Sequence, residues 1–131
     1  MIVVLDASAG IEVILNRSAA LSFKKQILNA KKVITSELYK AEVANVMWKY
    51  VSVGRLTADS AHDLMHLAYG LVDEYVDTSD LCDESLEQSI RLKHSVYDLL
   101  YLTVARRNAA FLLTMDKKLK NLARKEGIEC V

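Results

Sequence analysis

The first residues of the chain form an uninterrupted aliphatic run that ends in an acid. Residues 2–5 read Ile-Val-Val-Leu, a composition typical of a strand buried on both faces, as in a parallel sheet covered by helices. Asp6 follows directly, and a helical pattern begins near Ser8, which could cap that helix. Because open α/β sheets bind ligands at the carboxyl ends of their strands, this start predicts a parallel α/β fold with a polar site at one edge.

The rest of the chain alternates between short apolar runs and longer amphipathic stretches. Helices are expected at residues 8–15, 18–30, 37–53, 57–69, 81–93, 96–107 and 116–126, and short strands at residues 33–35, 75–76, 111–114 and 128–131. The helix at 96–107 is nearly all apolar, which predicts a central position. This alternation favours a three-layer α/β/α sandwich on a mostly parallel sheet of about five strands. We expect a single domain over residues 1–131.

Charge and cysteine content exclude several classes of protein. Seventeen Lys and Arg balance seventeen Asp and Glu, so any polyanion must bind to a local patch rather than to the protein as a whole. Cys82 and Cys130 have neither metal-site spacing nor a disulfide framework, which fits a reducing compartment. The apolar start is interrupted by Asp6 and is too short for a signal peptide or a membrane span. The expected protein is soluble and cytoplasmic.

Three further acids interrupt apolar surroundings as Asp6 does. Glu42 lies on an otherwise apolar helical stripe, Asp98 opens the apolar helix at 96–107, and Asp116 follows the apolar run at 111–113. No side chain on the face of Asp98 along its own helix can neutralise it.

Each acid also has a purely structural explanation. Asp6 and Asp116 could cap the helices that follow them, and Glu42 could pair with Lys49. The segment from Ser95 to Asp98 matches a capping-box pattern.

Together, the acids indicate a metal site. Strand carboxyl ends and the start of a returning helix share one edge of a doubly wound sheet, so these carboxylates are expected to converge. Converging carboxylates repel each other and raise each other's pKa, and a divalent cation relieves that repulsion. Oxygen ligands without His or Cys suit Mg²⁺ or Mn²⁺ rather than zinc. Such acidic metal sites commonly hydrolyse phosphate esters by activating a water for in-line attack.

The segments that carry these acids resemble the motifs of PIN-domain ribonucleases. They read Asp6-Ala7-Ser8, Glu42-Val-Ala-Asn45-Val, Val96-Tyr97-Asp98-Leu-Leu-Tyr101-Leu and Leu113-Thr114-Met-Asp116. Their order and spacing resemble those of VapC toxins of prokaryotic toxin–antitoxin pairs, from residue 2 to about residue 130. One departure is the short, glycine-free link at 93–95 before the third motif.

The resemblance implies an endoribonuclease that uses Mg²⁺ or Mn²⁺, with the catalytic and metal-binding acids at Asp6, Glu42, Asp98 and Asp116. It also implies polar neighbours that orient ligands or water, at Ser8, Asn45 and Thr114. The family commonly forms a homodimer inhibited by a VapB-type antitoxin. We therefore expect the toxin of such a pair; a PIN nuclease of RNA processing and a catalytically silent protein-binding module are the alternatives.

Basic residues near the third and fourth motifs could guide the RNA backbone, and a solvated surface explains them equally well. The candidates are Arg106, Arg107, Lys117 and Lys118.

Other metal chemistries fit the sequence less well. His62 and His66 have the spacing of a zinc-binding helix but lack a clear third ligand. A receiver domain would have an acid pair after the first strand, and a haloacid-dehalogenase-like phosphatase would have Asp-x-Asp, where this chain has Ser8.

Overall fold

A parallel sheet of four strands runs through the middle of the computed structural model, which describes residues 1–131. In sheet order β3-β2-β1-β4, the strands are Glu74–Val76, Lys32–Ser36, Ile2–Leu5 and Phe111–Leu113. The helices are α1 (Ala7–Ile14), α2 (Ala20–Asn29), α3 (Leu38–Ser52), α4 (Ala58–Tyr69), α5 (Cys82–Leu92), α6 (Val96–Arg107) and α7 (Lys117–Lys125), with a short 3-10 helix at Thr78–Asp80.

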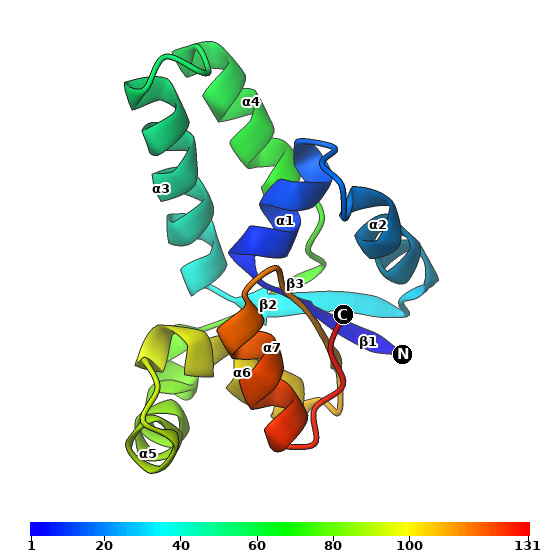
Figure 1. Ribbon diagram of the computed structural model, residues 1–131, viewed down its shortest axis with the longest axis vertical. Coiled ribbons are helices and arrows are strands. Elements are labelled where there is room, and N and C mark those ends of the chain that lie inside the picture. Colours follow the sequence, from blue (N-terminus) through cyan, green and yellow to red (C-terminus); the bar gives the residue numbers. More distant parts are fainter.

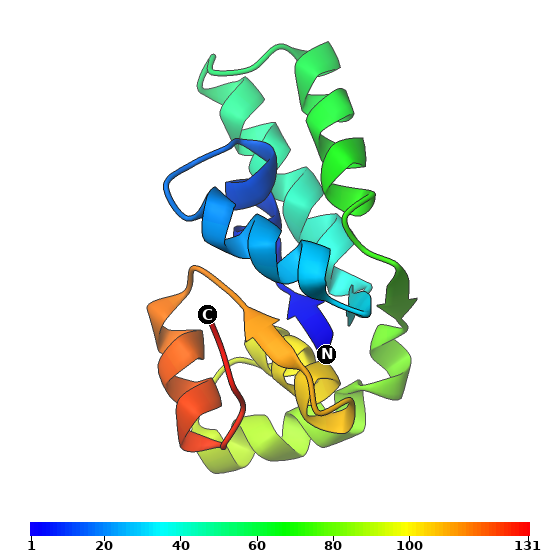
Figure 2. The same ribbon diagram turned by 90° about the vertical axis from the view of Figure 1, so that its right-hand side faces the viewer.

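Helices cover both faces of the sheet. Helices α1 to α4 lie on one face and α5 to α7 on the other (Figure 1). A view at right angles shows the same two helical layers separated by the strands (Figure 2). The predicted α/β/α sandwich is therefore confirmed.

Strand β1 lies at the centre of the core, as its aliphatic composition predicts. It pairs in parallel with β2 on one side and β4 on the other, so that Val4 lies between Ile34 and Leu112. Val3, Val4 and Leu5 are fully buried. Because both faces of β1 are covered by helices, only aliphatic side chains fit there without losing hydrogen bonds.

Helix α6 contains the longest uninterrupted run of buried residues of any helix. Every residue from Leu99 to Ala105 is buried, and the helix packs against β1, β2 and β4. Its boundaries agree with those expected from the sequence. The central position predicted for the helix at 96–107 is confirmed.

The sheet has four strands rather than the expected five. Residues 128–131 run beside β4 and exchange backbone hydrogen bonds with it, but they form only one isolated parallel bridge, between Leu112 and Cys130. The chain turns into this segment at Gly127, where φ is +72°. Since β4 itself has only three residues, little length remains for a regular ladder.

The connections of the chain place a topological switch point beside β1. The chain moves outward from β1 to β2 and β3 with helices on one face, then returns to β4 on the other side of β1 with helices on the opposite face. Ligand sites of open α/β sheets lie at such points, outside the carboxyl ends of the strands. No helix is long and apolar enough to cross a membrane.

Candidate active site

Asp6 lies at the switch point, between the end of β1 and the start of α1. Its Oδ1 accepts hydrogen bonds from the Ala9 backbone N–H at 2.9 Å and from the Ser8 hydroxyl at 2.7 Å, and its Oδ2 accepts one from Thr114. Asp6 is therefore the N-cap of α1, and the expectation that Ser8 caps this helix is wrong. The backbone of Asp6 is extended, as a cap requires, whereas Ser8 already lies inside the helix.

Two hydroxyl groups connect Asp6 to the loop that follows β4. The Met115 N–H donates to Ser8 Oγ at 2.9 Å, and the Asp116 N–H donates to Thr114 Oγ1 at 3.0 Å. Each hydroxyl then donates its own hydrogen to one oxygen of Asp6. The structure thus brings both hydroxyls named from the sequence against the first acid and links the first motif to the fourth.

Glu42, on α3, is held by a residue outside the candidates predicted from the sequence. The Tyr101 hydroxyl on α6 donates to Glu42 Oε1 at 2.6 Å, which leaves Oε2 without a protein donor. A pair between Glu42 and Lys49 does not form. Burial, and next the charge of Glu42, raise the pKa of Tyr101 far above its ordinary value, so the phenol stays protonated and keeps its role as donor.

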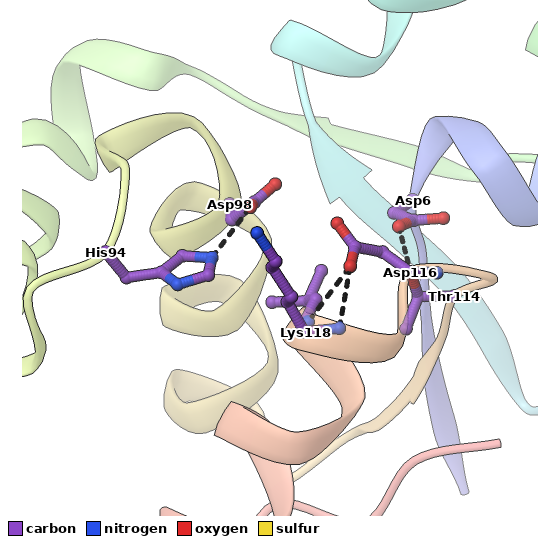
Figure 3. A network of polar contacts seen from close by, with 7 residues as sticks. Asp6, His94, Asp98, Thr114, Asp116 and Lys118 are labelled. Atoms are coloured by element: carbon purple, nitrogen blue, oxygen red, sulfur yellow. Dashed lines mark hydrogen bonds and ion pairs between the residues drawn. The ribbon is translucent and has the colours of Figure 1, made fainter.

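Asp98 contacts His94, the residue one helical turn before it. His94 Nε2 lies 2.8 Å from Asp98 Oδ2, which leaves Oδ1 without a protein donor (Figure 3). The Ser95 side chain makes no capping hydrogen bond, so the capping-box explanation of Asp98 is wrong. His94 is four residues before Asp98 in the sequence, but it precedes the helix, so the pattern of the helix alone does not reveal this contact.

Asp116 caps α7, as one of the structural explanations anticipated. Its Oδ1 accepts hydrogen bonds from the backbone N–H groups of Lys118, at 2.8 Å, and Leu119, at 3.3 Å. Its Oδ2 has no protein donor. Figure 3 shows the side chains of Asp6, Asp98 and Asp116 coming from three different elements into one region of the molecule.

Among the acids, Glu42 lies close enough to both Asp6 and Asp98 for their charges to repel. Burial raises the pKa of Asp6 to about 6, more than its hydrogen bonds lower it, and the charge of Glu42 raises it further. Burial likewise raises the pKa of Glu42, with a further contribution from the charge of Asp98. Asp6, Glu42 and Asp98 therefore form one group of negative charges whose repulsion a bound cation would relieve.

The donor set fits a hard divalent cation. Glu42, Asp98 and Asp116 each keep one carboxylate oxygen free of protein donors, and Mg²⁺ and Mn²⁺ prefer such oxygens. As the side chains stand, no three His, Cys, Asp or Glu residues are arranged closely enough to hold a metal ion. Ligation would therefore need the acids to move closer together, and Asp98 and Asp116 are half-buried rather than enclosed in the core.

The remaining residues named from the sequence fall into two groups. Lys117 and Lys118 are exposed in the first turn of α7, beside Asp116. Arg106 and Arg107 end α6 at the opposite edge of the sheet: Arg107 Nε binds Glu84 at 2.8 Å, and Arg106 lines a cavity of about 280 Å³ beside the first residue of β4. The structure therefore separates the two arginines from the acids.

Asn45 and the two histidines of α4 lie outside the group of acids. Asn45 is exposed on α3, and the hydrogen bond that holds Glu42 comes from Tyr101 instead. His62 and His66 are exposed, and the His66 ring lies nearly perpendicular to the Tyr69 ring, at 88°. The structure gives these histidines no third metal ligand.

Comparison with known proteins identifies the family. The family model described as the PIN domain matches residues 3–125. The chain belongs to the PIN-domain family. Ribonuclease VapC3 of Pyrobaculum aerophilum is 29% identical over 124 residues, which cover 91% of this chain and 92% of that protein.

Solved structures of other proteins have the same fold. The crystal structure of PAE2754 from Pyrobaculum aerophilum superposes with a TM-score of 0.77 and 25% identity, covering 100% of this chain and 92% of that one. VapBC2 from Rickettsia felis, bound to a DNA fragment from its promoter, gives a TM-score of 0.70 at 15% identity, covering 100% and 98%. The arrangement of layers and strands is thus shared along the whole chain.

Proposed function

We propose that this PIN-domain protein is an endoribonuclease that hydrolyses RNA phosphodiester bonds with Mg²⁺ or Mn²⁺ at Asp6, Glu42, Asp98 and Asp116. The observation that carries the proposal is the convergence of carboxylates at the topological switch point, where Glu42 lies within range of the charges of both Asp6 and Asp98. The similarity to a protein named as a ribonuclease supports RNA as the substrate.

The four acids have distinct roles in the proposed reaction. Asp6 is anchored by the hydroxyls of Ser8 and Thr114 and so provides a rigid negative charge. Glu42, Asp98 and Asp116 each offer one free oxygen toward a cation. A divalent cation bound there supplies positive charge that favours ionisation of a water and stabilises negative charge developing on the phosphate.

The exposed lysines at the start of α7 are suited to hold the RNA backbone. Lys117 and Lys118 lie next to Asp116, where a phosphate that approaches the acids would pass. Contacts between lysine and phosphate add affinity without reading sequence. Because Arg107 is paired with Glu84 at the other end of α6, we assign it and Arg106 no part in this contact.

We further propose that the protein is the toxin of a toxin–antitoxin pair and acts as a homodimer in the cytoplasm. VapC3 and the VapBC2 complex, to which it is similar, support a VapB-type antitoxin as its protein partner. Both cysteines are free, which suits a reducing compartment. An exposed apolar hollow between α3 and α4, with Trp48 62% exposed at its rim, gives the chain a surface on which a protein can pack.

An RNA cleavage assay tests the proposal. Wild-type protein is incubated with a mixture of single-stranded and structured RNA, with Mg²⁺, with Mn²⁺ and with a chelator. The expected result is cleavage that requires the cation and is lost in Asp98→Asn, while Asp63→Asn, an exposed acid on α4, cleaves like wild type. Cleavage that persists in the chelator or in Asp98→Asn contradicts the proposal, and no cleavage under any condition favours the protein-binding module.

A further inference from the structure

One hydrogen bond joins the two helical layers at the candidate active site. Tyr101 lies on α6, three residues after Asp98 and therefore on the same side of that helix. Its hydroxyl donates to Glu42 on α3, which belongs to the opposite layer (Figure 1). A single helix thus carries one acid of the group and the donor that contacts another.

The two partners of this hydrogen bond differ in burial and in their other contacts. The Tyr101 side chain is only 2% exposed and is fixed by packing in the core. Glu42 is half-buried, makes no ion pair and has no other side-chain hydrogen bond. The tyrosine is therefore the rigid partner, and the glutamate is the one whose position depends on the bond.

A free glutamate side chain samples several rotamers, and ordering it opposes cation binding. A donor that already fixes one carboxylate oxygen removes part of that cost and turns the other oxygen toward the ligand. Ser8 and Thr114 fix oxygens of Asp6 in this way, and His94 fixes one oxygen of Asp98. For Glu42 the only such donor is Tyr101.

We propose that Tyr101 is a positioning residue that holds Glu42 in one conformation with Oε2 turned toward the cation. The proposal rests on the proposed function, because it assumes that Glu42 binds a divalent cation. It assigns Tyr101 an effect on cation affinity, exerted through Glu42, and no contact with RNA.

The test is the affinity for Mn²⁺ alone, measured by titration calorimetry without RNA. Tyr101→Phe removes the hydroxyl and keeps the ring that fills the core. We expect the Kd for Mn²⁺ to rise by about 10- to 100-fold, the usual effect of losing a donor behind a metal ligand. The matched control is Tyr39→Phe, a second buried tyrosine whose hydroxyl donates to the Ala68 carbonyl at 2.8 Å; its Kd should equal that of wild type.

A double variant distinguishes action through Glu42 from a general disturbance of the fold. If Tyr101 acts through Glu42, then Tyr101→Phe combined with Glu42→Gln binds Mn²⁺ no more weakly than Glu42→Gln alone. Losses that add in the double variant overturn the proposal, because Tyr101 would then act by another route.

Further outcomes separate the failure of this proposal from the failure of the proposed function. Wild-type affinity in Tyr101→Phe, together with loss of binding in Asp98→Asn, overturns the role of Tyr101 and leaves the metal site intact. No Mn²⁺ binding by wild type overturns both. If Tyr101→Phe fails to fold, a crystal structure of the wild type with Mn²⁺ decides: a Glu42 that binds the ion with its bond to Tyr101 broken overturns the proposal.

Discussion

Thr114 donates its hydroxyl hydrogen to Asp6 across 108 positions of the chain and so joins the ends of β4 and β1. The same hydroxyl accepts a hydrogen bond from the Asp116 backbone N–H at 3.0 Å. Thr114 therefore fixes the first acid and, at the same time, the start of the segment that carries the fourth. The fully buried Thr114 lies at the switch point of the sheet, the place where open α/β sheets bind their ligands.

Replacement of Thr114 by valine should reduce both stability and cation affinity. Valine keeps the shape but leaves the Asp116 N–H and one oxygen of Asp6 without their partner, which costs about 1–3 kcal/mol. Urea unfolding with and without Mn²⁺ measures both effects. Thr103→Val is the control, because Thr103 is also fully buried and hydrogen-bonded, to Ser85 at 2.9 Å. It should lose stability and keep its Mn²⁺ affinity; equal Mn²⁺ affinity in both variants would contradict the role of Thr114.

The buried carboxyl group of Asp6 should make the metal-free protein less stable as pH rises from about 4 to about 7. Burial raises the pKa of Asp6 from 3.8 to about 6, so the folded protein binds a proton that the unfolded chain has released. Stability linked to this group is therefore present below pH 3.8 and is lost as pH rises through the folded pKa. Two pH units correspond to about 3 kcal/mol.

The comparison that isolates this effect uses Asp6→Asn, because other groups also titrate in the same range. The free energy of unfolding of wild type minus that of the variant should fall by up to about 3 kcal/mol between pH 4 and pH 7 in chelator. Saturating Mg²⁺ should stabilise wild type at pH 7 and leave Asp6→Asn unchanged. A difference that does not vary with pH would contradict the raised pKa of Asp6 in the folded protein.

The two pairs of basic residues should differ in their effect on RNA binding. Lys118→Ala should weaken RNA binding in chelator and reduce the slope of log K against log salt by about 1, since one phosphate contact is lost. Arg107→Ala should leave that slope unchanged and lower thermal stability, because Arg107 pairs with Glu84. Filter binding at several salt concentrations gives both slopes. Equal slopes in the two variants would contradict a contact between α7 and RNA.

Gly10 should not tolerate a side chain. A Cβ at this position would overlap the hydroxyl of the fully buried Tyr39, which is held in place by its bond to the Ala68 carbonyl. We expect Gly10→Ala to destabilise the protein by about 1–3 kcal/mol, the usual cost of overpacking a core. Thermal unfolding measures this, and the double variant Gly10→Ala with Tyr39→Phe should recover part of the loss. A fully stable single variant would contradict the packing of α1 against Tyr39.

The elements of the fold could be predicted because they depend on local patterns, and the same patterns select the four acids as candidates. The aliphatic run before Asp6 and the apolar helix around Asp98 are visible in any window of a few residues. Distant partners could not be predicted in the same way. The bond from Tyr101 to Glu42 spans 59 positions and two helical layers, and nothing in the sequence around either residue specifies the other.

The two capping predictions, at Ser8 and at Ser95, were wrong because local rules compete. Serine and aspartate are both good N-caps. Asp6 is the cap here because its backbone is extended, whereas Ser8 already lies inside the helix. Ser95 has the spacing of a capping box, but Asp98 contacts His94 instead. Arg106 and Arg107 follow the third motif closely in sequence, and yet they lie at the opposite edge of the sheet from Asp98, because α6 runs from one edge to the other.

The most direct test of the account is Mn²⁺ binding by wild type, Asp6→Asn and Asp98→Asn, measured by titration calorimetry at pH 7 with circular dichroism to confirm folding. Asp63→Asn is the control, since that acid is exposed on α4. We predict that wild type and Asp63→Asn bind Mn²⁺ with the same affinity and that both site variants lose binding while remaining folded. Folded Asp6→Asn and Asp98→Asn proteins that bind Mn²⁺ as tightly as wild type would contradict the central claim that these acids form a metal site.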